Sequence, residues 1–435
     1  MSDQEDRNRA VSEARDFNPY ASEFLEREFE IYRTLREHLP VARSEAMIEP
    51  ALGGGTPGGW VLTRYDDGCE VLTDPDGFSS QSQDYAVRPW IPQAIDPPMH
   101  TSYRRILNPM FTPDAMSKLE PHLYDYANEL ADRMLEKDSF DFVADYADPF
   151  PSVIFCELAG FPAEDYRQIM DWKNVIMHPS DGHERGRELA IEKARSMDLE
   201  VDPSEGLSTE QVLAVSAAAV GEVYQYFQGL LDARRQDPRD DLVSRLLAAR
   251  FDGERPLTQE ELEDTLFLLF MAGLDTVASA LGLMIQDFAT NEVKRKEFIT
   301  ILEGDDPKLL GQAIEELVRV HSIVLLPRRV TRERSFHGTR FRADDGVLVP
   351  TQGINRDPEQ FPNPDELDYT RFPNRHAGFG LGPHRCLGIH LARRELRVAL
   401  QVFLQKCPDF QVDPNRKANR FGGMKGLATL PLVKG

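Results

Sequence analysis

Apolar residues recur at the spacing of amphipathic helices over much of the chain, above all between residues 110 and 325. Thr258-Gln259-Glu260-Glu261 has the form of a capping box and predicts a helix that runs to about Asn291. At 1.5 Å per residue, such a helix is roughly 45–50 Å long and crosses a whole domain. Further helices are predicted after Asp306-Pro307 and over residues 387–404.

Strand-like alternation is confined to short runs at residues 60–64, 347–350 and 427–433. The pattern therefore predicts a mainly α fold with small β-sheets, of the α+β class. We expect residues 1–435 to form a single domain and residues 1–20 to be a flexible N-terminal segment. The charged stretch 178–210, broken by Pro and Gly, is expected to be an exposed, mobile loop. It either is simply solvated or acts as a lid over a substrate entrance.

Composition limits the possible partners. The chain has 435 residues, of which 41% are hydrophobic and 28% charged, and its net charge is −23. Such an acidic protein is a poor binder of nucleic acid or anionic membranes, and it needs a local basic patch to dock an acidic partner. The longest apolar stretch, residues 266–274, is too short to span a bilayer, and the N-terminus has no apolar signal region. We expect a cytoplasmic protein.

A glycine-rich turn leads to Cys386 in the sequence Phe-Gly-Leu-Gly-Pro-His-Arg-Cys-Leu-Gly at residues 379–388. Two glycines and a proline predict a tight hairpin, and a helical pattern follows it directly. Cys386 is therefore placed at a helix N-terminus, where backbone N–H groups and the helix dipole stabilise a thiolate. The glycines admit a flat ligand, and Phe379 can pack beside the sulfur. A buried thiol in a glycine-rich turn is the simpler interpretation.

The middle of the predicted long helix reads Ala272-Gly273-Leu274-Asp275-Thr276. Ala272 and Thr276 share a face, which leaves room for a diatomic ligand and offers it a hydroxyl. Gly273 and the Thr276 hydroxyl favour a kink or bulge. Asp275 lies about 100° round the helix, where it can reach solvent. On its own the pattern is also typical of a polar step in a core helix.

Together these two segments resemble the cytochrome P-450 family. Residues 379–388 match its FGxGxHxCxG haem-binding signature at every fixed position, and the Asp-Thr step precedes the cysteine by about 110 residues, as in that family. The resemblance covers about residues 60–435 and implies the cytochrome P-450 fold. It also implies that Cys386 ligates the iron of haem b and that Asp275 and Thr276 relay protons to bound O₂. The other haem contacts that it implies here are Ala272, Phe379, Gly380, His384 and Gly388.

Haem carries two carboxylates, so the resemblance also assigns cations to it. His100 and Arg104 are four residues apart and match family contacts to a propionate. Arg328 matches another, with Arg329 as the alternative in register. A guanidinium fork suits a carboxylate, although either site alone would usually be an exposed charge.

An ExxR step at Glu316 and Arg319 places an acid and a base on one helical face. In isolation it is a surface ion pair of little energetic value. In the family that the chain resembles it forms a buried charge cluster, completed here by Arg371. We assign these three residues to folding and haem insertion.

Residues 91–98, 267–276 and 390–396 resemble the bacterial camphor-hydroxylase branch of the family. The tyrosine that binds the camphor carbonyl in that branch falls near Arg88, which either binds a substrate carboxylate or faces water, the latter being favoured. The resemblance implies a small apolar substrate, of terpenoid type. The residues expected to line its pocket, with ordinary core as the alternative for each, are Trp90, Leu268, Met271, Ile323 and Val324.

The resemblance further implies a monomeric monooxygenase that inserts one atom of O₂ into an unactivated C–H bond. Its electrons would come from a ferredoxin and an NAD(P)H-dependent ferredoxin reductase. A basic dock for the ferredoxin is expected among Arg104, Arg105, Arg385, Arg393 and Arg394. A haem-thiolate isomerase or peroxygenase, which does not need Asp275 and Thr276, and a haem sensor are the alternative functions.

Overall fold

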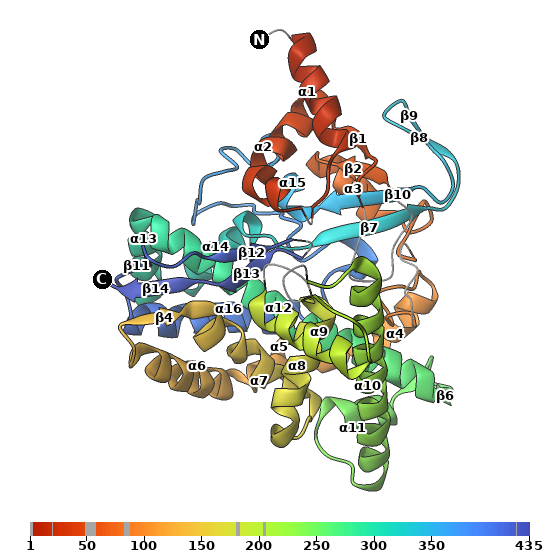
Figure 1. The fold of residues 1–435 in the computed structure, drawn as a ribbon, viewed down its shortest axis with the longest axis vertical. Coiled ribbons are helices and arrows are strands. Elements are labelled where there is room, and N and C mark those ends of the chain that lie inside the picture. The colour runs from red at the N-terminus through yellow and green to blue at the C-terminus, as the bar shows by residue number, and fades with distance from the viewer. Residues whose placement is uncertain are drawn as a thin grey trace.

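The computed structural model describes residues 3–19, 21–47, 58–81, 88–179, 183–202, 206–422 and 424–435. Figure 1 shows a helical body with the largest sheet and the N-terminal helices at one end. The fold is mainly α with small sheets, as the sequence predicts.

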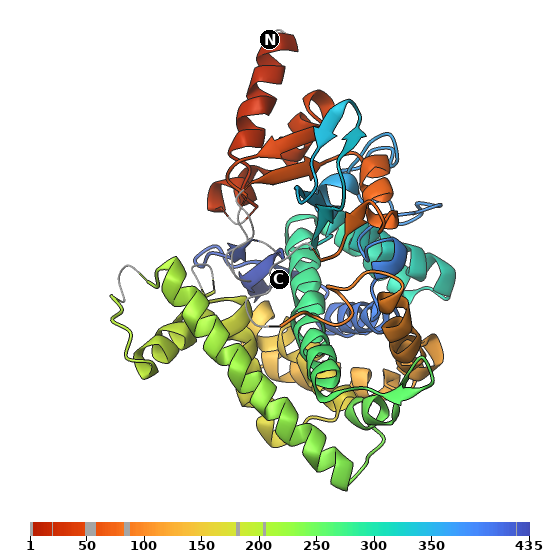
Figure 2. The same cartoon turned by 90° about the vertical axis from the view of Figure 1, so that its right-hand side faces the viewer.

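The central element is helix α12, Gln259–Thr290, which runs through the middle of the helical body (Figure 2). It begins at the predicted capping box, in which the Glu261 N–H donates to Thr258 Oγ1 and the Thr258 N–H donates to the Glu261 carboxylate. It is the one described helix that is long and apolar enough to cross a membrane, but 72% of its apolar window is buried within the protein. α12 is therefore a core helix.

The remaining helices surround α12 or pack on the sheet end (Figures 1 and 2). α14 begins after Asp306, as predicted, because the Asp306 carboxylate accepts from the N–H groups of Lys308 and Leu309. Apart from α12, the bounds of the described α-helices are α1 Asp3–Arg15, α2 Ser22–His38, α3 Tyr65–Thr73, α4 Met99–Leu107, α5 Pro113–Ser117, α6 Glu120–Leu135, α7 Pro149–Ala159, α8 Tyr166–Met177, α9 Glu184–Ser196, α10 Thr209–Gln236, α11 Leu242–Ala248, α13 Glu292–Glu303, α14 Pro307–Val320, α15 Thr351–Ile354 and α16 Ile389–Lys406.

The largest sheet has the strand order β1-β2-β10-β7-β3, in which β2 and β10 are parallel and the other pairs are antiparallel. The run 427–433 forms two strands rather than one, because the chain leaves the first sheet at Leu430 and joins another. The strand bounds are β1 Val41–Ser44, β2 Gly59–Leu62, β3 Phe78–Ser79, β4 Ser139–Asp141, β5 Arg250–Phe251, β6 Arg255–Pro256, β7 Leu325–Val330, β8 Arg334–Phe336, β9 Thr339–Phe341, β10 Gly346–Pro350, β11 Phe410–Val412, β12 Asn419–Phe421, β13 Gly426–Thr429 and β14 Pro431–Lys434.

Two segments differ from the sequence prediction. Within residues 1–20, expected to be flexible, α1 packs on α2 and buries Ala10 and Ala14, and Phe17 then meets the Phe24 ring at 4.7 Å. Within 178–210, expected to be a loop, α9 is an ordered helix. Its small and apolar residues fall on one buried face, which the high charge of the segment concealed; they are Gly186, Leu189, Ala190, Ile191 and Ala194.

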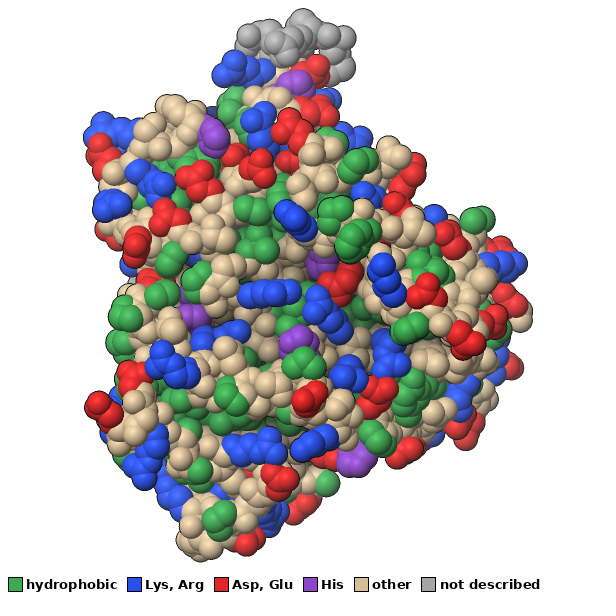
Figure 3. Space-filling model, turned by 180° about the vertical axis from the view of Figure 1, so that it is seen from behind, with side chains coloured by type: hydrophobic (Ala, Val, Ile, Leu, Met, Phe, Trp, Pro, Cys, Tyr) green, Lys and Arg blue, Asp and Glu red, His purple; other side chains and the backbone are tan. Residues whose placement is uncertain are grey.

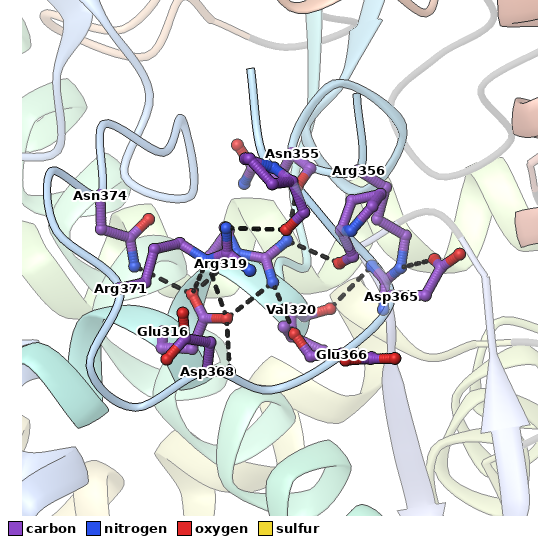
Figure 4. A network of polar contacts seen from close by, with 12 residues as sticks. Glu316, Arg319, Val320, Asn355, Arg356, Asp365, Glu366, Asp368, Arg371 and Asn374 are labelled. Atoms are coloured by element: carbon purple, nitrogen blue, oxygen red, sulfur yellow. Dashed lines mark hydrogen bonds and ion pairs between the residues drawn. The ribbon is translucent and has the colours of Figure 1, made fainter. Parts of the chain in front are cut away.

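A buried ion network fixes the segment that leads to Cys386 (Figure 4). Glu316 and Arg319 have no exposed surface, and two hydrogen bonds of 2.8 Å join the Arg319 guanidinium to the Glu316 carboxylate. Arg371 donates to both Glu316 oxygens at 3.1 Å, and Asn374 adds a bond at 3.0 Å. The structure thus brings together the three residues expected to form the charge cluster.

The same network holds backbone that is distant in sequence. Arg319 donates to the carbonyl oxygens of Asn355, Pro364 and Glu366 at 2.7–3.1 Å. The Asn355 side chain in turn accepts from the N–H of Ala377 at 2.7 Å. Because the chain from 355 to 377 is tied to α14 in this way, the position of the following turn is set by buried charge as well as by packing.

We predict that Arg319→Leu lowers the free energy of unfolding by about 3–5 kcal/mol, because it breaks a buried ion pair and removes the donor that bonds to three backbone carbonyls. Chemical denaturation monitored by circular dichroism measures this loss. Arg340→Leu is the control, since Arg340 pairs with Glu333 on the exposed β8–β9 hairpin, and little change is expected there. Equal losses in the two variants would contradict the prediction.

Candidate functional site

The hairpin before Cys386 has the backbone that its glycines allow. Gly380 and Gly382 both have φ of +66°, a conformation that residues with a side chain rarely adopt. A Cβ on Gly382 would lie 2.4 Å from the carbonyl oxygen of Leu72, so the hairpin also needs glycine to approach α3. The Cys386 N–H donates to the Phe379 carbonyl at 2.8 Å and closes the turn.

The Cys386 sulfur lies three residues before the first residue of α16. Burial raises the pKa of the Cys386 thiol, whereas the Gly388 N–H and the charges of Arg104, Arg393 and Arg385 act in the opposite direction. On balance the surroundings therefore disfavour a free thiolate, because the nearby N–H group and arginine charges only partly offset burial. A cation bound directly to the sulfur would supply the missing counter-charge.

Four basic side chains converge near this turn. The rings of His100 and His384 lie with centroids 4.1 Å apart. Burial lowers the pKa of His100 to about 4 and of His384 to about 3, and the charges of Arg104 and Arg328 act in the same direction on both. Among the described residues, the charge of Asp96 opposes this effect at His100.

Two buried atoms in this cluster, His100 Nδ1 and His384 Nε2, have no hydrogen-bond partner among the described residues. Unpartnered buried ring nitrogens are costly unless they donate to an acceptor. A ligand with two carboxylates would supply acceptors and negative charge together. The cluster therefore fits the two propionates of a haem, and it comprises all four of the basic residues assigned to them.

A partly exposed stripe runs along the middle of α12. Leu268, Ala272 and Thr276 follow one another at intervals of four residues. Ala272 is exposed and the other two are partly buried, whereas nearly all the remaining residues in the centre of the helix are buried. The Thr276 hydroxyl donates to the Ala272 carbonyl at 3.1 Å, and the helix continues without a π-bulge. The predicted bulge is absent. Gly273 instead allows close packing, since a Cβ there would lie 2.3 Å from the Phe155 ring on α7.

Comparison with known proteins decides what kind of site this is. The family model described as cytochrome P-450 matches residues 211–432. The chain belongs to the cytochrome P-450 family. Among curated relatives, the mycinamicin IV hydroxylase/epoxidase of Micromonospora griseorubida is 32% identical over 92% of this chain and 94% of that protein. The polyketide biosynthesis cytochrome P-450 PksS of Bacillus subtilis strain 168 is 30% identical over 96% of this chain and 98% of its own.

Solved cytochrome P-450 structures share the whole fold. The structure of PksS has a TM-score of 0.78 with 28% identity and covers 96% of this chain and 100% of that one. CYP109E1 of Bacillus megaterium, solved with testosterone, also has a TM-score of 0.78, with 26% identity and full coverage of both chains. Cytochromes P-450 are haem-thiolate enzymes, and Cys386 stands at the signature cysteine position of this chain.

Asp275 does not reach solvent as the sequence suggested. Its side chain is 5% exposed, and its Oδ1 lies 3.0 Å from His178 Nε2 and 3.5 Å from Lys173 Nζ. Burial alone would raise the pKa of Asp275, but the charges of His178 and Lys173 and the hydrogen bond from His178 lower it well below its usual range. Sequence reasoning missed Lys173 and His178, because neither lies in a motif and the fold alone brings α8 to α12.

Arg88 is paired within the protein, although 26% of its side chain stays exposed. It lies 2.6 Å from Glu263 and 2.7 Å from Asp264, and its guanidinium stacks 4.7 Å from the centre of the Tyr224 ring. Glu263 and Asp264, side by side on α12, therefore already pair with the Arg88 guanidinium that could otherwise have bound a substrate carboxylate. This fastens the chain ahead of Trp90 to α12 and α10.

The residues expected to line the substrate pocket lie in three different places. Leu268 lies on the partly exposed stripe of α12, and Trp90 packs on Phe267 with ring centroids 5.9 Å apart. Met271 is only 3% exposed and belongs to the main core, off that stripe. Ile323 and Val324 immediately precede β7, and the Ile323 carbonyl accepts from the N–H of Lys425 at 3.0 Å.

Two arginines of the expected ferredoxin dock are engaged within the protein. Arg393 makes two bonds of 2.6–2.7 Å to Glu315, and Arg394 pairs with Glu120. Arg385 is exposed, and Arg105 is exposed and pairs with Asp252 at 3.0 Å. A charge change at Arg393 or Arg394 would thus disturb helix packing as well as docking.

We predict that Arg104→Leu makes haem dissociate about tenfold faster, because a charged hydrogen bond contributes roughly 1.5–3 kcal/mol. Transfer of haem to apomyoglobin measures the rate. Arg105→Leu is the matched control, since its side chain is 68% exposed and pairs with Asp252. Haem loss that is equally fast in both variants would count against the assignment of Arg104 to a propionate.

Proposed function

We propose that this cytochrome P-450 hydroxylates a small apolar molecule, of terpenoid type, with O₂ and with electrons from a separate ferredoxin and its NAD(P)H-dependent reductase. The observation that carries the proposal is the partly exposed Ala272–Thr276 stripe of α12 beside a buried Asp275. We also propose that the protein acts in the cytoplasm as a monomer.

Haem held by Cys386 supplies the activation of O₂ when it is bound. His100, Arg104, Arg328 and His384 would hold its propionates, as argued from the ring nitrogens of the two histidines, which have no partner among the described residues, and from the charges of the two arginines. The Thr276 hydroxyl, now bonded to the Ala272 carbonyl, can turn to donate to a ligand on the same face of α12. Asp275, on the neighbouring face, is the carboxylate that supplies protons to this part of the helix.

The engaged state of Arg88 supports an apolar substrate, because no unpaired cation is left at that position to bind a substrate carboxylate. The named relatives suggest a second candidate, a larger macrolide or polyketide: one is a hydroxylase/epoxidase of mycinamicin IV, and another belongs to polyketide biosynthesis. A screen of terpenoids, steroids and macrolides for a low-to-high-spin shift of the ferric protein distinguishes the two classes.

The carbon monoxide difference spectrum of the reduced protein tests the haem ligand. We expect the absorbance maximum from which the family takes its name in the wild type, and its loss in Cys386→Ser. A wild-type protein that binds haem without this maximum would refute thiolate ligation.

We predict that Thr276→Ala keeps haem and the substrate-induced spin shift but diverts most reducing equivalents to hydrogen peroxide, because the hydroxyl that orders proton delivery is gone. Product and peroxide formed per NAD(P)H consumed measure this. Thr290→Ala, a hydroxyl that bonds to Gln286 near the end of α12, is the control. Undiminished product formation in Thr276→Ala would favour an isomerase or peroxygenase instead.

The ferredoxin dock is proposed on the face opposite α8–α10. Figure 3 shows this face, with basic side chains spread across its middle although the chain as a whole is acidic. An open pocket of about 390 Å³ beside α4 is lined by Arg105, Arg245 and Arg250 among others. Local positive charge on an acidic protein attracts an acidic carrier.

We predict that Arg385→Glu raises the KM for ferredoxin several-fold and leaves kcat at saturating ferredoxin nearly unchanged, because steering acts on association. Steady-state kinetics at two ionic strengths measure both values. Arg340→Glu makes the same charge change on the remote β8–β9 hairpin and serves as the control. If both variants behave alike, the dock is not at Arg385.

A further inference from the structure

Arg393 of α16 contacts the turn that carries Cys386. Its guanidinium carbon lies 5.3 Å from the centre of the Phe379 ring, which is the distance of a cation–π contact. Phe379 begins the turn, and its carbonyl oxygen accepts from the Cys386 N–H at 2.8 Å. A positive charge therefore lies against the residue whose backbone is bonded to the backbone of the cysteine.

A carboxylate on another helix fixes this guanidinium. Glu315 of α14 accepts from Arg393 Nε at 2.7 Å and from Arg393 Nη2 at 2.6 Å, in the bidentate geometry that suits arginine. Burial alone would raise the pKa of Glu315, but the hydrogen bonds from His376 and Arg393 and the charge of Arg393 lower it to about 2. The carboxylate is therefore ionised at neutral pH and keeps the arginine in place.

A buried histidine holds the same carboxylate. The His376 side chain is 3% exposed, and its Nδ1 accepts from the Gly378 N–H at 3.1 Å. Because a nitrogen that accepts carries no proton, the ring proton belongs on Nε2, which lies 3.2 Å from Glu315 Oε2 and donates to it. His376 and Gly378 lead directly into the turn, so both the arginine and its carboxylate are fastened to the segment that carries the cysteine.

The charge of Arg393 acts on the sulfur. Arg104, Arg393 and Arg385 all favour negative charge at Cys386. Arg104 is assigned to a propionate and Arg385 is exposed, whereas a bidentate ion pair fixes Arg393. A fixed positive charge near a thiolate stabilises electron density on the sulfur, so the sulfur donates less to a metal that it binds. The same charge favours the more reduced state of that metal.

We propose that Arg393 is a positioning residue that raises the reduction potential of the haem iron through Phe379 and the Cys386 sulfur. Glu315 and His376 hold the guanidinium in the position where it does so. This inference rests on the haem ligation proposed for Cys386, but it does not depend on the identity of the substrate or of the electron carrier.

Spectroelectrochemical titration with chemical mediators measures the potential of the haem-loaded protein without ferredoxin or substrate. In Arg393→Gln we expect unchanged haem content and a more negative potential. The ferrous state should become less favourable by roughly three- to tenfold, which is about 30–60 mV for one electron. Arg393→Lys keeps the charge but not the planar fork, and it should show less than half of this shift.

The ferrous carbon monoxide complex gives a second measurement. A sulfur that donates more to iron strengthens the donation from iron into carbon monoxide and weakens the C–O bond. The C–O stretching frequency should therefore fall in Arg393→Gln relative to the wild type.

Arg394→Gln is the matched control. Arg394 is the next residue of α16, its side chain is 26% exposed against 32% for Arg393, and it pairs with Glu120 of α6. Successive side chains on a helix point about 100° apart, so this change removes the same charge from a different face. We expect less than a third of the shift in potential and an unchanged C–O frequency.

Equal shifts of potential in Arg393→Gln and Arg394→Gln would overturn the inference, because they would show only an effect of net charge. An unchanged potential in Arg393→Gln would also overturn it, as would a shift in Arg393→Lys as large as that in Arg393→Gln, which would show an effect of packing. The carbon monoxide difference spectrum of the wild type tests the thiolate ligand separately, so a failure of the proposed ligation is distinguished from a failure of the role of Arg393.

Discussion

Burial of the Glu316 carboxylate, which has no exposed surface, obliges the surrounding chain to supply cations and N–H groups. Arg319 comes from the same helix, but Arg371, Asn374 and the N–H of Asp368 come from the long segment after β10. That segment has little regular structure of its own, so the charge contacts replace the ladder of a helix or sheet. The turn that carries Cys386 follows this segment directly, so its position depends on the same charge contacts.

Three of the buried charge clusters in the described part of the chain differ in how far their polar groups are paired. Around Glu316 the buried carboxylate accepts from two arginines and an asparagine, as befits a structural element. Among the described residues around His100 and His384, two arginines outnumber one aspartate and two ring nitrogens have no partner, as befits a site for an anionic ligand. Around Asp275 one carboxylate oxygen lies beside His178 and Lys173, and the other has no hydrogen-bond partner in the described part of the chain.

Much of the architecture could be predicted from local sequence. The capping box at Thr258, the aspartate cap before Pro307 and the glycines before Cys386 each act within a few residues, so their geometry is encoded locally. The mainly α class and the association of the four basic residues were also anticipated. Contacts between distant elements were not, because His178 meets Asp275, and Arg88 meets Glu263 and Asp264, only after α8, α10 and α12 have packed together. The high charge of the α9 segment led to the prediction of an exposed loop, although one face of this helix is buried.

The contact of Gly273 with Phe155 has a consequence for the precision of the site. The aromatic ring fills the space that a methyl group at 273 would take, so α7 sits against bare backbone and acts as a stop against rotation of α12 about its own axis. A helix turned by even a fraction of a residue would swing the hydroxyl at 276 and the carboxylate at 275 in the same sense, one away from its ligand and the other away from its imidazole. The rotational position of both side chains thus depends on residue 273 having no Cβ atom.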